Sequence, residues 1–237
     1  MTGRADEVSL FAVCDGARAY PLQPAQDFKR VGDGDTGPNT GGMGAYTPLP
    51  WAPDGLVAEV AERVLQPTVD EMARRGTPFS GLLYAGLALT KRGVRVIEFN
   101  ARFGDPETQP LMALLDSPLG VLLRAAARGT LDEVAAPRWR DGAAVAVVVA
   151  SKDYPATPRT GDVIHGLMDA ERVEGVDVIH AGTARGEDGA LVTSGGRVLA
   201  VTAVGTDVAD ARARAYEAVG KIRIDGSHHR TDIAAGI

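Results

Sequence analysis

Two oxygen-bearing side chains, Glu98 and Asn100, stand two residues apart in the apolar segment Val94 to Asn100. Alternate side chains of an extended strand share a face, so we expect these two to point to one side and Arg95 to the other. A carboxylate and an amide oxygen suit Mg²⁺, which keeps water and phosphate oxygens in its other positions. Arg102 follows, and its planar fork suits a phosphate or an acyl phosphate. The spacing predicts a metal–nucleotide site, and a solvated strand face with a Glu–Arg ion pair is the alternative.

A second candidate is the glycine-rich segment from Gly32 to Gly44, in which six of thirteen residues are glycine. Such a run predicts neither a helix nor a strand interior. Free backbone N–H groups in a glycine-rich turn bind anions, and Lys29 and Arg30 beside them add positive charge. The P-loop and dinucleotide-binding patterns are both absent. A long surface loop is the alternative, although irregular stretches of this length are more often functional than ordinary connections are.

Two further carboxylates follow Arg102, at Asp105 and Glu107. They suit a metal or a substrate amine. For Asp105 we favour another interpretation, the start of a helix with Pro106 at its first position. Glu107 would then lie near the positive end of the helix dipole, and its role stays open.

The elements that must position these groups follow from periodicity and turn residues. In the first part we expect a strand over 8–14, a helix over 56–72 kinked at Pro67, a hairpin of strands 82–90 and 94–100, and helices on either side of Pro118. In the second part we expect strands near 144–150, 176–181, 190–193 and 198–204, and a helix over 207–222. The boundary between the two parts falls between residues 129 and 141.

Composition narrows the class of protein. The 237 residues include 31 acidic and 25 basic side chains, a net charge of −6, and no Lys/Arg block, which disfavours a nucleic-acid partner. No apolar run reaches the roughly 18 residues of a membrane span, and the N-terminus does not resemble a signal peptide, so we expect no membrane association and a cytoplasmic location. The lone Cys14 excludes an internal disulfide and a multi-cysteine zinc site.

Several long strings resemble the phosphoribosylamine–glycine ligase (glycinamide ribonucleotide synthetase) family of ATP-grasp enzymes, from about Glu7 to the C-terminus. They are Gln26-Asp-Phe-Lys-Arg-Val31, Asp35-Thr-Gly-Pro-Asn-Thr-Gly-Gly-Met-Gly-Ala-Tyr46, Gly81-Leu-Leu-Tyr-Ala-Gly86, Val96-Ile-Glu-Phe-Asn-Ala-Arg-Phe-Gly-Asp-Pro-Glu-Thr-Gln109 and Thr193-Ser-Gly-Gly-Arg-Val-Leu-Ala-Val201. The resemblance implies an α+β fold: the larger lobe of an ATP-grasp domain, an antiparallel sheet with helices, over residues 1–135. A small β-rich C-terminal domain follows over residues 136–237.

The resemblance also implies a reaction. Glycine's carboxylate attacks the γ-phosphate of ATP to give glycyl phosphate and ADP, and the amine of 5-phosphoribosylamine then displaces phosphate. The product is glycinamide ribonucleotide, in purine biosynthesis. The matching positions would be metal ligands for Mg²⁺ or Mn²⁺ (Glu98, Asn100), a catalytic phosphate contact (Arg102), nucleotide contacts (Glu7, at the ATP ribose, with Lys29 and Arg30), and substrate contacts (Asp27, Asn39, Thr40, Gly41, Gly42, Met43, Gly44, Asp105).

The chain also departs from the family. Its members begin with a substrate-binding domain and a small ATP-grasp subdomain, and neither has a match here. Leu114 stands where many relatives carry an arginine. We therefore expect a truncated chain without ligase turnover of its own, exposing apolar surface along Val8 to Val13. The alternatives are a non-catalytic fragment, a half-enzyme that needs a separate N-terminal partner, and a ligase of another ATP-grasp subfamily such as a carboxylase.

Overall fold

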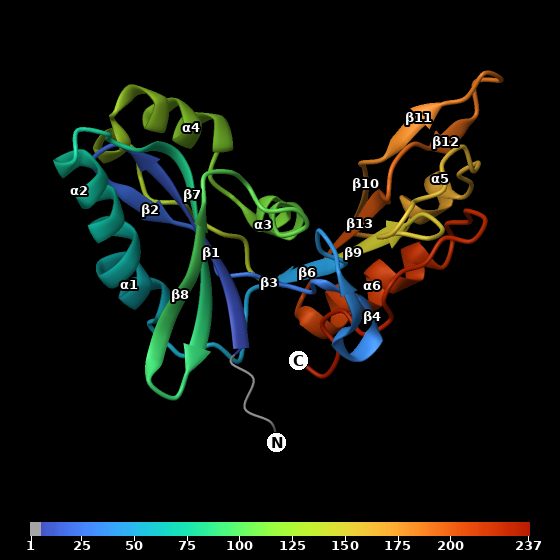
Figure 1. Ribbon diagram of the computed structural model, residues 1–237, viewed down its shortest axis with the longest axis horizontal. Coiled ribbons are helices and arrows are strands. Elements are labelled where there is room, and N and C mark those ends of the chain that lie inside the picture. Colours follow the sequence, from blue (N-terminus) through green and yellow to red (C-terminus); the bar gives the residue numbers. More distant parts are fainter. Residues whose placement is uncertain (1–5) are drawn as a thin grey trace. The chain divides into compact units, whose positions relative to one another are not determined.

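The strands of this chain form two larger sheets, each in its own unit of the structure (Figure 1). The computed structural model describes residues 6–237. Unit 1 comprises the chain up to Gln26, Pro48–Gly104 and Leu115–Arg140, and unit 2 comprises Asp27–Thr47, Asp105–Leu114 and Asp141–Ile237. The predicted division after residue 135 cuts the chain once, whereas these two units interleave along it.

The sheet of unit 1 is antiparallel, with the strand order β2-β1-β7-β8. Its strands are β1 (Asp6–Asp15), β2 (Ala19–Pro21), β7 (Ser80–Thr90) and β8 (Gly93–Asn100). The predicted first strand and the predicted hairpin are both confirmed. The expected exposure of Val8 to Val13 is wrong, because β1 lies between β2 and β7 and helix α4 (Leu119–Arg128) packs on it. The exposed apolar side chains of this sheet belong instead to its edge strand β8: Val96, Ile97 and Phe99.

The predicted kinked helix is built from three pieces: α1 (Leu56–Val60), a π-helical turn (Ala61–Leu65) and α2 (Gln66–Arg74). Pro67 has no N–H to donate to the preceding turn, and a wider turn directly before it accommodates that loss. Val60, Leu65 and Val69 are fully buried, so one apolar stripe continues through the kink. Helix α4 follows Pro118 and ends at Arg128, and the next residue, Gly129, adopts the left-handed conformation.

The larger sheet of unit 2 has the order β10-β13-β9-β6-β3. Its strands are β3 (Gln26–Asp27), β6 (Gly44–Thr47), β9 (Ala143–Ala150), β10 (Val176–His180) and β13 (Arg197–Gly205). Helices α3 (Thr108–Leu114) and α6 (Val208–Val219) both pack on β9 and β13, and β9 is buried along its whole length. Unit 2 also contains the short helix α5 (Leu167–Ala170) and a small hairpin of β11 (Thr183–Arg185) and β12 (Leu191–Thr193), and unit 1 contains a 3-10 turn (Leu131–Glu133).

Two local predictions are wrong. The glycine-rich segment is not irregular throughout, because β4 (Arg30–Gly32) and β5 (Thr36–Asn39) pair around a 3-10 turn (Asp33–Asp35) in which Gly34 has a φ of 64°. The predicted helix does not begin at Pro106, since α3 begins at Thr108. Asp105 therefore has no capping role, and its carboxylate accepts a hydrogen bond from the Gln109 side chain instead (3.0 Å).

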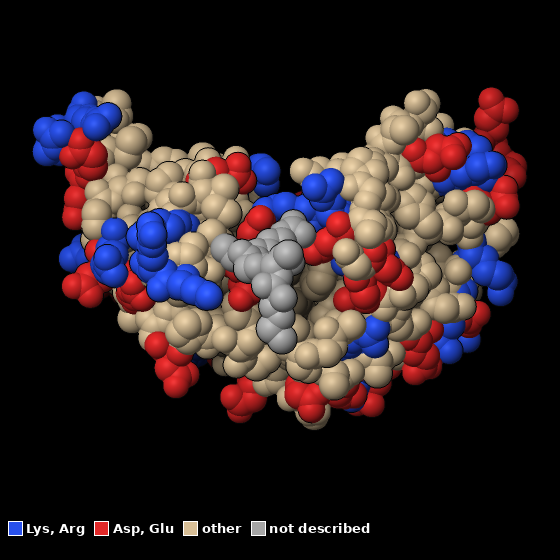
Figure 2. Space-filling model, turned by 60° about the horizontal axis from the view of Figure 1, so that its bottom comes forward, with Lys and Arg blue, Asp and Glu red and all other residues tan. Residues whose placement is uncertain are grey.

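The surface agrees with the mixed composition. On the face drawn in Figure 2, Lys and Arg side chains lie among Asp and Glu side chains and do not form one continuous basic surface. Within residues 6–237, no helix combines the length and the apolar character that crossing a bilayer requires.

Gly205 is expected to be essential for the packing of unit 2. A Cβ atom at this position would lie 2.3 Å from the backbone nitrogen of Ala211, in the first turn of α6. Gly205→Ala should therefore lower the free energy of unfolding by about 1–3 kcal/mol, as overpacked positions do. Urea denaturation followed by circular dichroism measures this. Gly120→Ala in α4 is the control, because nothing lies within 4 Å of that position; equal stability of the two variants would refute the argument.

Candidate functional site

Glu98 and Asn100 lie side by side on one face of the unit 1 sheet. Residues paired across antiparallel strands share a face, and the register pairs Ser9 with Gly86 and Gly86 with Glu98. The Asn100 amide Nδ2 donates to Glu98 Oε1 (3.3 Å). The predicted convergence of these two side chains is therefore confirmed.

A β-bulge in β8 changes which other side chains share this face. Gly86 pairs with Glu98 but the next residue of β7, Leu87, pairs with Val96, so Ile97 is left without a partner. The extra residue shifts the alternation by one position. Arg95 pairs with Ala88, two residues from Gly86, and so lies on the same face as Glu98. The expectation that Arg95 lies on the opposite face is wrong for this reason.

Gly86, in the middle strand β7, lies next to the Glu98 side chain. A Cβ atom on Gly86 would lie 3.2 Å from Glu98 Cγ and 3.3 Å from the Tyr84 hydroxyl. The Tyr84 hydroxyl in turn lies 3.3 Å from Ser9 Oγ, and both residues are buried. The absence of a side chain on Gly86 therefore leaves room for the Glu98 side chain beside a buried pair of hydroxyls.

Glu7 and Arg102 complete the predicted groups of unit 1. Glu7 pairs with Ala88, so it shares the face of Glu98 although it lies on β1. Arg102 is exposed, two residues beyond the end of β8, and its Nη1 donates to the Phe103 carbonyl (2.9 Å). The structure thus places Glu7, Glu98 and Asn100 on one face, with Arg102 beyond the end of the strand.

The side-chain oxygens of Glu98 and Asn100 suit a divalent cation that prefers oxygen ligands. Within residues 6–237, no group of three or more His, Cys, Asp or Glu side chains is arranged to hold a metal, so the chain provides no closed cage there. One carboxylate with one amide oxygen suits Mg²⁺ or Mn²⁺, whose remaining positions are filled by water and phosphate oxygens. The Asn100 amide would turn its oxygen toward the ion.

The glycine-rich segment lies in unit 2, and its backbone N–H groups are mostly used within the protein. Gly34 N–H donates to Asp232 (2.8 Å), Gly41 N–H to the Tyr154 hydroxyl (3.0 Å) and Gly42 N–H to Thr40 Oγ1 (2.9 Å). The interpretation of these groups as free donors for an anion is therefore wrong. Asn39 and Gly41 are exposed, whereas Gly42, Met43 and Gly44 are buried.

Arg197 connects this segment to Asp105. Its Nη1 donates to the carbonyl oxygens of Gly41 (2.7 Å) and Asp105 (2.7 Å), and its Nη2 lies 3.3 Å from an Asp105 carboxylate oxygen. Gly42 packs closely there, since a Cβ atom on it would lie 2.4 Å from Pro106 Cδ. One guanidinium thus holds together two segments, each of which contains predicted substrate contacts.

Arg230 holds the other end of the segment. Its side chain is only 1% exposed and stacks over the Phe28 ring, with the guanidinium carbon 4.9 Å from the ring centroid. It forms ion pairs with Asp35 (2.8 Å) and Asp232 (2.7 Å). Local sequence patterns do not reveal these roles, because Arg197 contacts Gly41 and Asp105, and Arg230 contacts Asp35, across long separations in sequence.

The basic residues before the segment already have partners. Arg30 donates to the Gly37 carbonyl (2.7 Å), and Lys29 lies 3.8 Å from the carboxylate of Asp27, which is 9% exposed. Thr40 donates through its backbone N–H and its hydroxyl to the Lys29 carbonyl (2.7 and 2.9 Å). These contacts stabilise the hairpin of β4 and β5.

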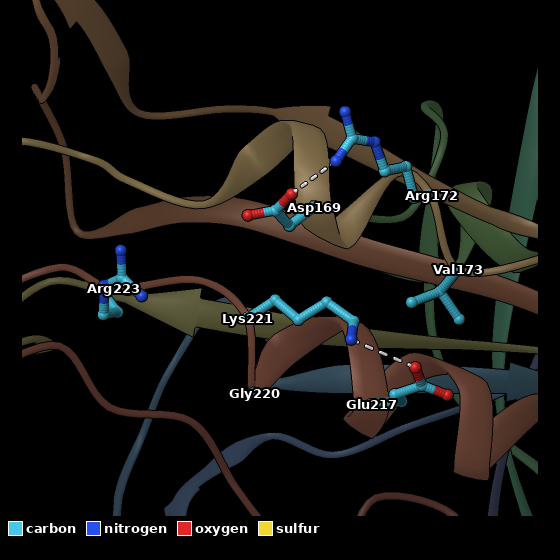
Figure 3. A pocket seen from close by; sticks show the side chains of 7 residues that line it. All are labelled: Asp169, Arg172, Val173, Glu217, Gly220, Lys221 and Arg223. Carbon is cyan, nitrogen blue, oxygen red and sulfur yellow. Dashed lines mark hydrogen bonds and ion pairs between the residues drawn. The ribbon is translucent and has the colours of Figure 1, made fainter.

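A separate hollow of about 500 Å³ in unit 2 contains none of the predicted residues (Figure 3). It is lined by Asp169, Arg172, Val173, Glu217, Gly220, Lys221 and Arg223. Arg172 pairs with Asp169 (3.0 Å) and Lys221 with Glu217 (3.2 Å), each within or next to its own helix. Such exposed neighbouring pairs are typical of a solvated helix surface.

Two family models match the chain, and both describe one enzyme. The model of the phosphoribosylglycinamide synthetase ATP-grasp (A) domain matches residues 2–108, and that of the phosphoribosylglycinamide synthetase C domain matches residues 144–236. The chain is 67% identical over 231 residues to the phosphoribosylamine–glycine ligase of Streptomyces coelicolor, covering 97% of this chain and 55% of that protein. It is 58% identical over 227 residues to that of Mycobacterium tuberculosis, covering 96% and 52%.

Solved structures agree on the fold. A crystal structure of phosphoribosylamine–glycine ligase from Thermotoga maritima matches with a TM-score of 0.85 and 35% identity, over 97% of this chain and 56% of that one. The biotin carboxylase subunit of pyruvate carboxylase matches with a TM-score of 0.66 at 13% identity, over 97% and 48%, and shows a shared fold alone. The chain spans about half the length of the curated relatives that it matches.

Acid should weaken the contact between Asp232 and the turn of the β4–β5 hairpin. Burial by itself would raise the pKa of this carboxyl, but hydrogen bonds from Arg230 and from Gly34 N–H outweigh it and lower the pKa from 3.8 to about 2. A carboxyl group with a lowered pKa stabilises the fold above its unfolded pKa, and this contribution is lost as the pH falls toward 2. Asp232→Asn should be less stable at pH 7 and lose less stability between pH 5 and pH 2 in urea titrations. Asp177→Asn, exposed on β10, is the control, and parallel pH profiles for wild type and Asp232→Asn would contradict the assignment.

Loss of the Arg197 guanidinium should loosen the segment at Gly41 and Gly42. Arg197→Gln removes the donors to both backbone carbonyls, so amide hydrogen exchange over residues 40–43 should accelerate by about tenfold or more. Arg185→Gln is the matched control, because Arg185 donates to a carbonyl in the exposed β11–β12 hairpin. Exchange as slow as in the wild type would show that Arg197 does not hold the segment.

Proposed function

The chain belongs to the phosphoribosylglycinamide synthetase family, and we propose that it forms part of an ATP-dependent ligase that joins glycine to 5-phosphoribosylamine. The products are glycinamide ribonucleotide, ADP and phosphate, in de novo purine biosynthesis. The observation that carries the proposal is the placement of Glu98 and Asn100 side by side on one face, with Glu7 on the same face. We place this enzyme in the cytoplasm.

The chemistry brings anions together. Glycine's carboxylate attacks the γ-phosphorus of ATP, ADP leaves, and the amine of 5-phosphoribosylamine then attacks the acyl carbon of glycyl phosphate as phosphate leaves. Cationic groups must therefore offset the charge on the phosphate oxygens. Glu98 and Asn100 would hold Mg²⁺ or Mn²⁺, which supplies that charge when bound. Arg102 would donate to the transferring phosphoryl group, and its guanidinium is exposed at the end of β8.

We assign the remaining contacts by the same proposal. Glu7 would contact the ATP ribose, and Lys29 and Arg30 would face the nucleotide. The substrate contacts would come from unit 2: Asp27, Asn39, Thr40, Gly41, Gly42 and Asp105. Burial of Met43 and Gly44 supports a packing role for these two residues. The boundary between an ATP-grasp lobe (residues 1–135) and a C-terminal domain (136–237) would fall in the stretch that neither family model matches.

One assay tests the ligase directly. The chain is incubated with ATP, glycine, 5-phosphoribosylamine and Mg²⁺, alone and together with a polypeptide equivalent to the N-terminal part of the Streptomyces coelicolor relative. ADP formation that requires both glycine and 5-phosphoribosylamine supports the proposal, and the two mixtures reveal whether a separate N-terminal partner is needed. No such ADP formation in either mixture would contradict it.

Glu98→Gln should abolish metal-dependent turnover while leaving the fold intact. The two side chains are nearly equal in volume, but the change removes the one negative charge of the ligand pair. Turnover in the active mixture should fall by at least 100-fold, and Mn²⁺ binding followed by electron paramagnetic resonance should weaken in parallel. Asn100→Ala should act in the same direction, with less than additive effects in the double variant, because both act through one ion. Glu62→Gln, in the π-helical turn, is the control, and near-wild-type turnover of folded Glu98→Gln at low Mg²⁺ would refute the metal assignment.

A further inference from the structure

We propose that Arg95 is a polyphosphate-binding residue of unit 1, carried to the face of Glu98 and Asn100 by the bulge at Ile97. This inference rests on the proposed metal–nucleotide role of that face. In a regular strand Arg95 and Glu98, three residues apart, would lie on opposite faces, and the unpaired Ile97 reverses this relation.

The register gives the separation along the sheet. Arg95 pairs with Ala88 and Glu98 pairs with Gly86, so the two side chains leave the sheet two positions apart. At about 3.4 Å per residue this is roughly 7 Å, a distance that an extended arginine side chain spans. Glu7 pairs with Ala88 from the other side, so Glu7 and Arg95 flank Ala88 in one row across three strands. A nucleotide whose ribose lies at Glu7 and whose metal-bound phosphates lie at Glu98 would therefore pass within reach of Arg95.

The exposure and the few partners of the Arg95 side chain agree with this role. Arg95 is exposed, and its Nη1 donates to the carbonyl oxygen of the neighbouring Val94 (3.0 Å). No ion pair neutralises its guanidinium within residues 6–237, although the Glu98 carboxylate shares its face. A guanidinium has five N–H donors, so most of them are available to phosphate oxygens. A triphosphate carries more negative charge than one divalent ion neutralises, and a second cation beside the metal offsets part of the excess.

The turn between β7 and β8 provides a matched comparison. Lys91 and Arg92 are exposed cations close to Arg95 in sequence, but they lie in the hairpin turn outside the paired rows. If any positive charge near this end of the sheet attracted polyphosphate, Arg92 would serve as well as Arg95. If placement on the face decides, only Arg95 matters.

Binding by the 237-residue chain separates these cases without requiring turnover. Mn²⁺ alone is titrated by electron paramagnetic resonance, and ATP and inorganic tripolyphosphate are titrated by calorimetry in the presence of saturating Mn²⁺. Arg95→Gln should weaken the binding of both polyphosphates about tenfold, and Arg95→Lys should weaken it less. Mn²⁺ alone should bind Arg95→Gln as tightly as wild type or slightly more tightly, because a nearby cation is removed. Arg92→Gln should stay within twofold of wild type in all titrations, and circular dichroism checks that each variant is folded.

Three results would overturn the inference. Equal weakening by Arg92→Gln and Arg95→Gln would show that charge alone matters. Weakening for ATP but not for tripolyphosphate would place Arg95 at the nucleoside rather than at the phosphates. Failure of wild type to bind Mn²⁺ or either polyphosphate would overturn the proposed metal–nucleotide face together with this inference, whereas the first two results leave that proposal standing.

Discussion

The antiparallel pairing of β1, β7 and β8 decides which side chains of unit 1 can act together. Backbone hydrogen bonds fix each row across the three strands, and the rows set one face with Glu7, Glu98 and Asn100 on it. Gly86 in the middle row leaves room for Glu98 beside buried hydroxyls. The bulge at Ile97 then adds Arg95 to that face. Two carboxylates, an amide and a cation thereby share one surface.

In unit 2, the buried Arg230 and the half-buried Arg197 fix the backbone of the glycine-rich segment, which its glycines would otherwise leave flexible. Arg230 is held between Asp35 and Asp232, and Arg197 joins Gly41 to Asp105 through carbonyl oxygens. Charge-assisted hydrogen bonds of this kind are stronger than neutral ones, and the burial of Arg230 makes its pairing obligatory. The glycines serve close approach here, since a side chain on Gly42 would overlap Pro106. The family strings of this segment thus include residues that shape its backbone.

The two units carry different kinds of polar groups. Unit 1 carries the oxygen donors and the arginine at the end of β8, which suit a metal and phosphates. Unit 2 carries Asp105 and the exposed part of the glycine-rich segment. The family models divide the chain differently: the ATP-grasp match over residues 2–108 includes Asp27–Thr47 of unit 2, whereas the C-domain match over residues 144–236 lies within unit 2.

Local sequence patterns determined most of the elements and the family. Alternation and apolar periodicity predicted the β7–β8 hairpin, the kink at Pro67 and the convergence of Glu98 and Asn100, because each depends on neighbours within a few residues. Tertiary structure alone decided the face of Arg95, the burial of β1 and the partners of the glycine-rich segment. A bulge is specified by pairing with another strand, and Arg197 and Arg230 act on segments that are distant in sequence. Such contacts produce no periodic pattern in the sequence, because they form between residues that only folding brings together.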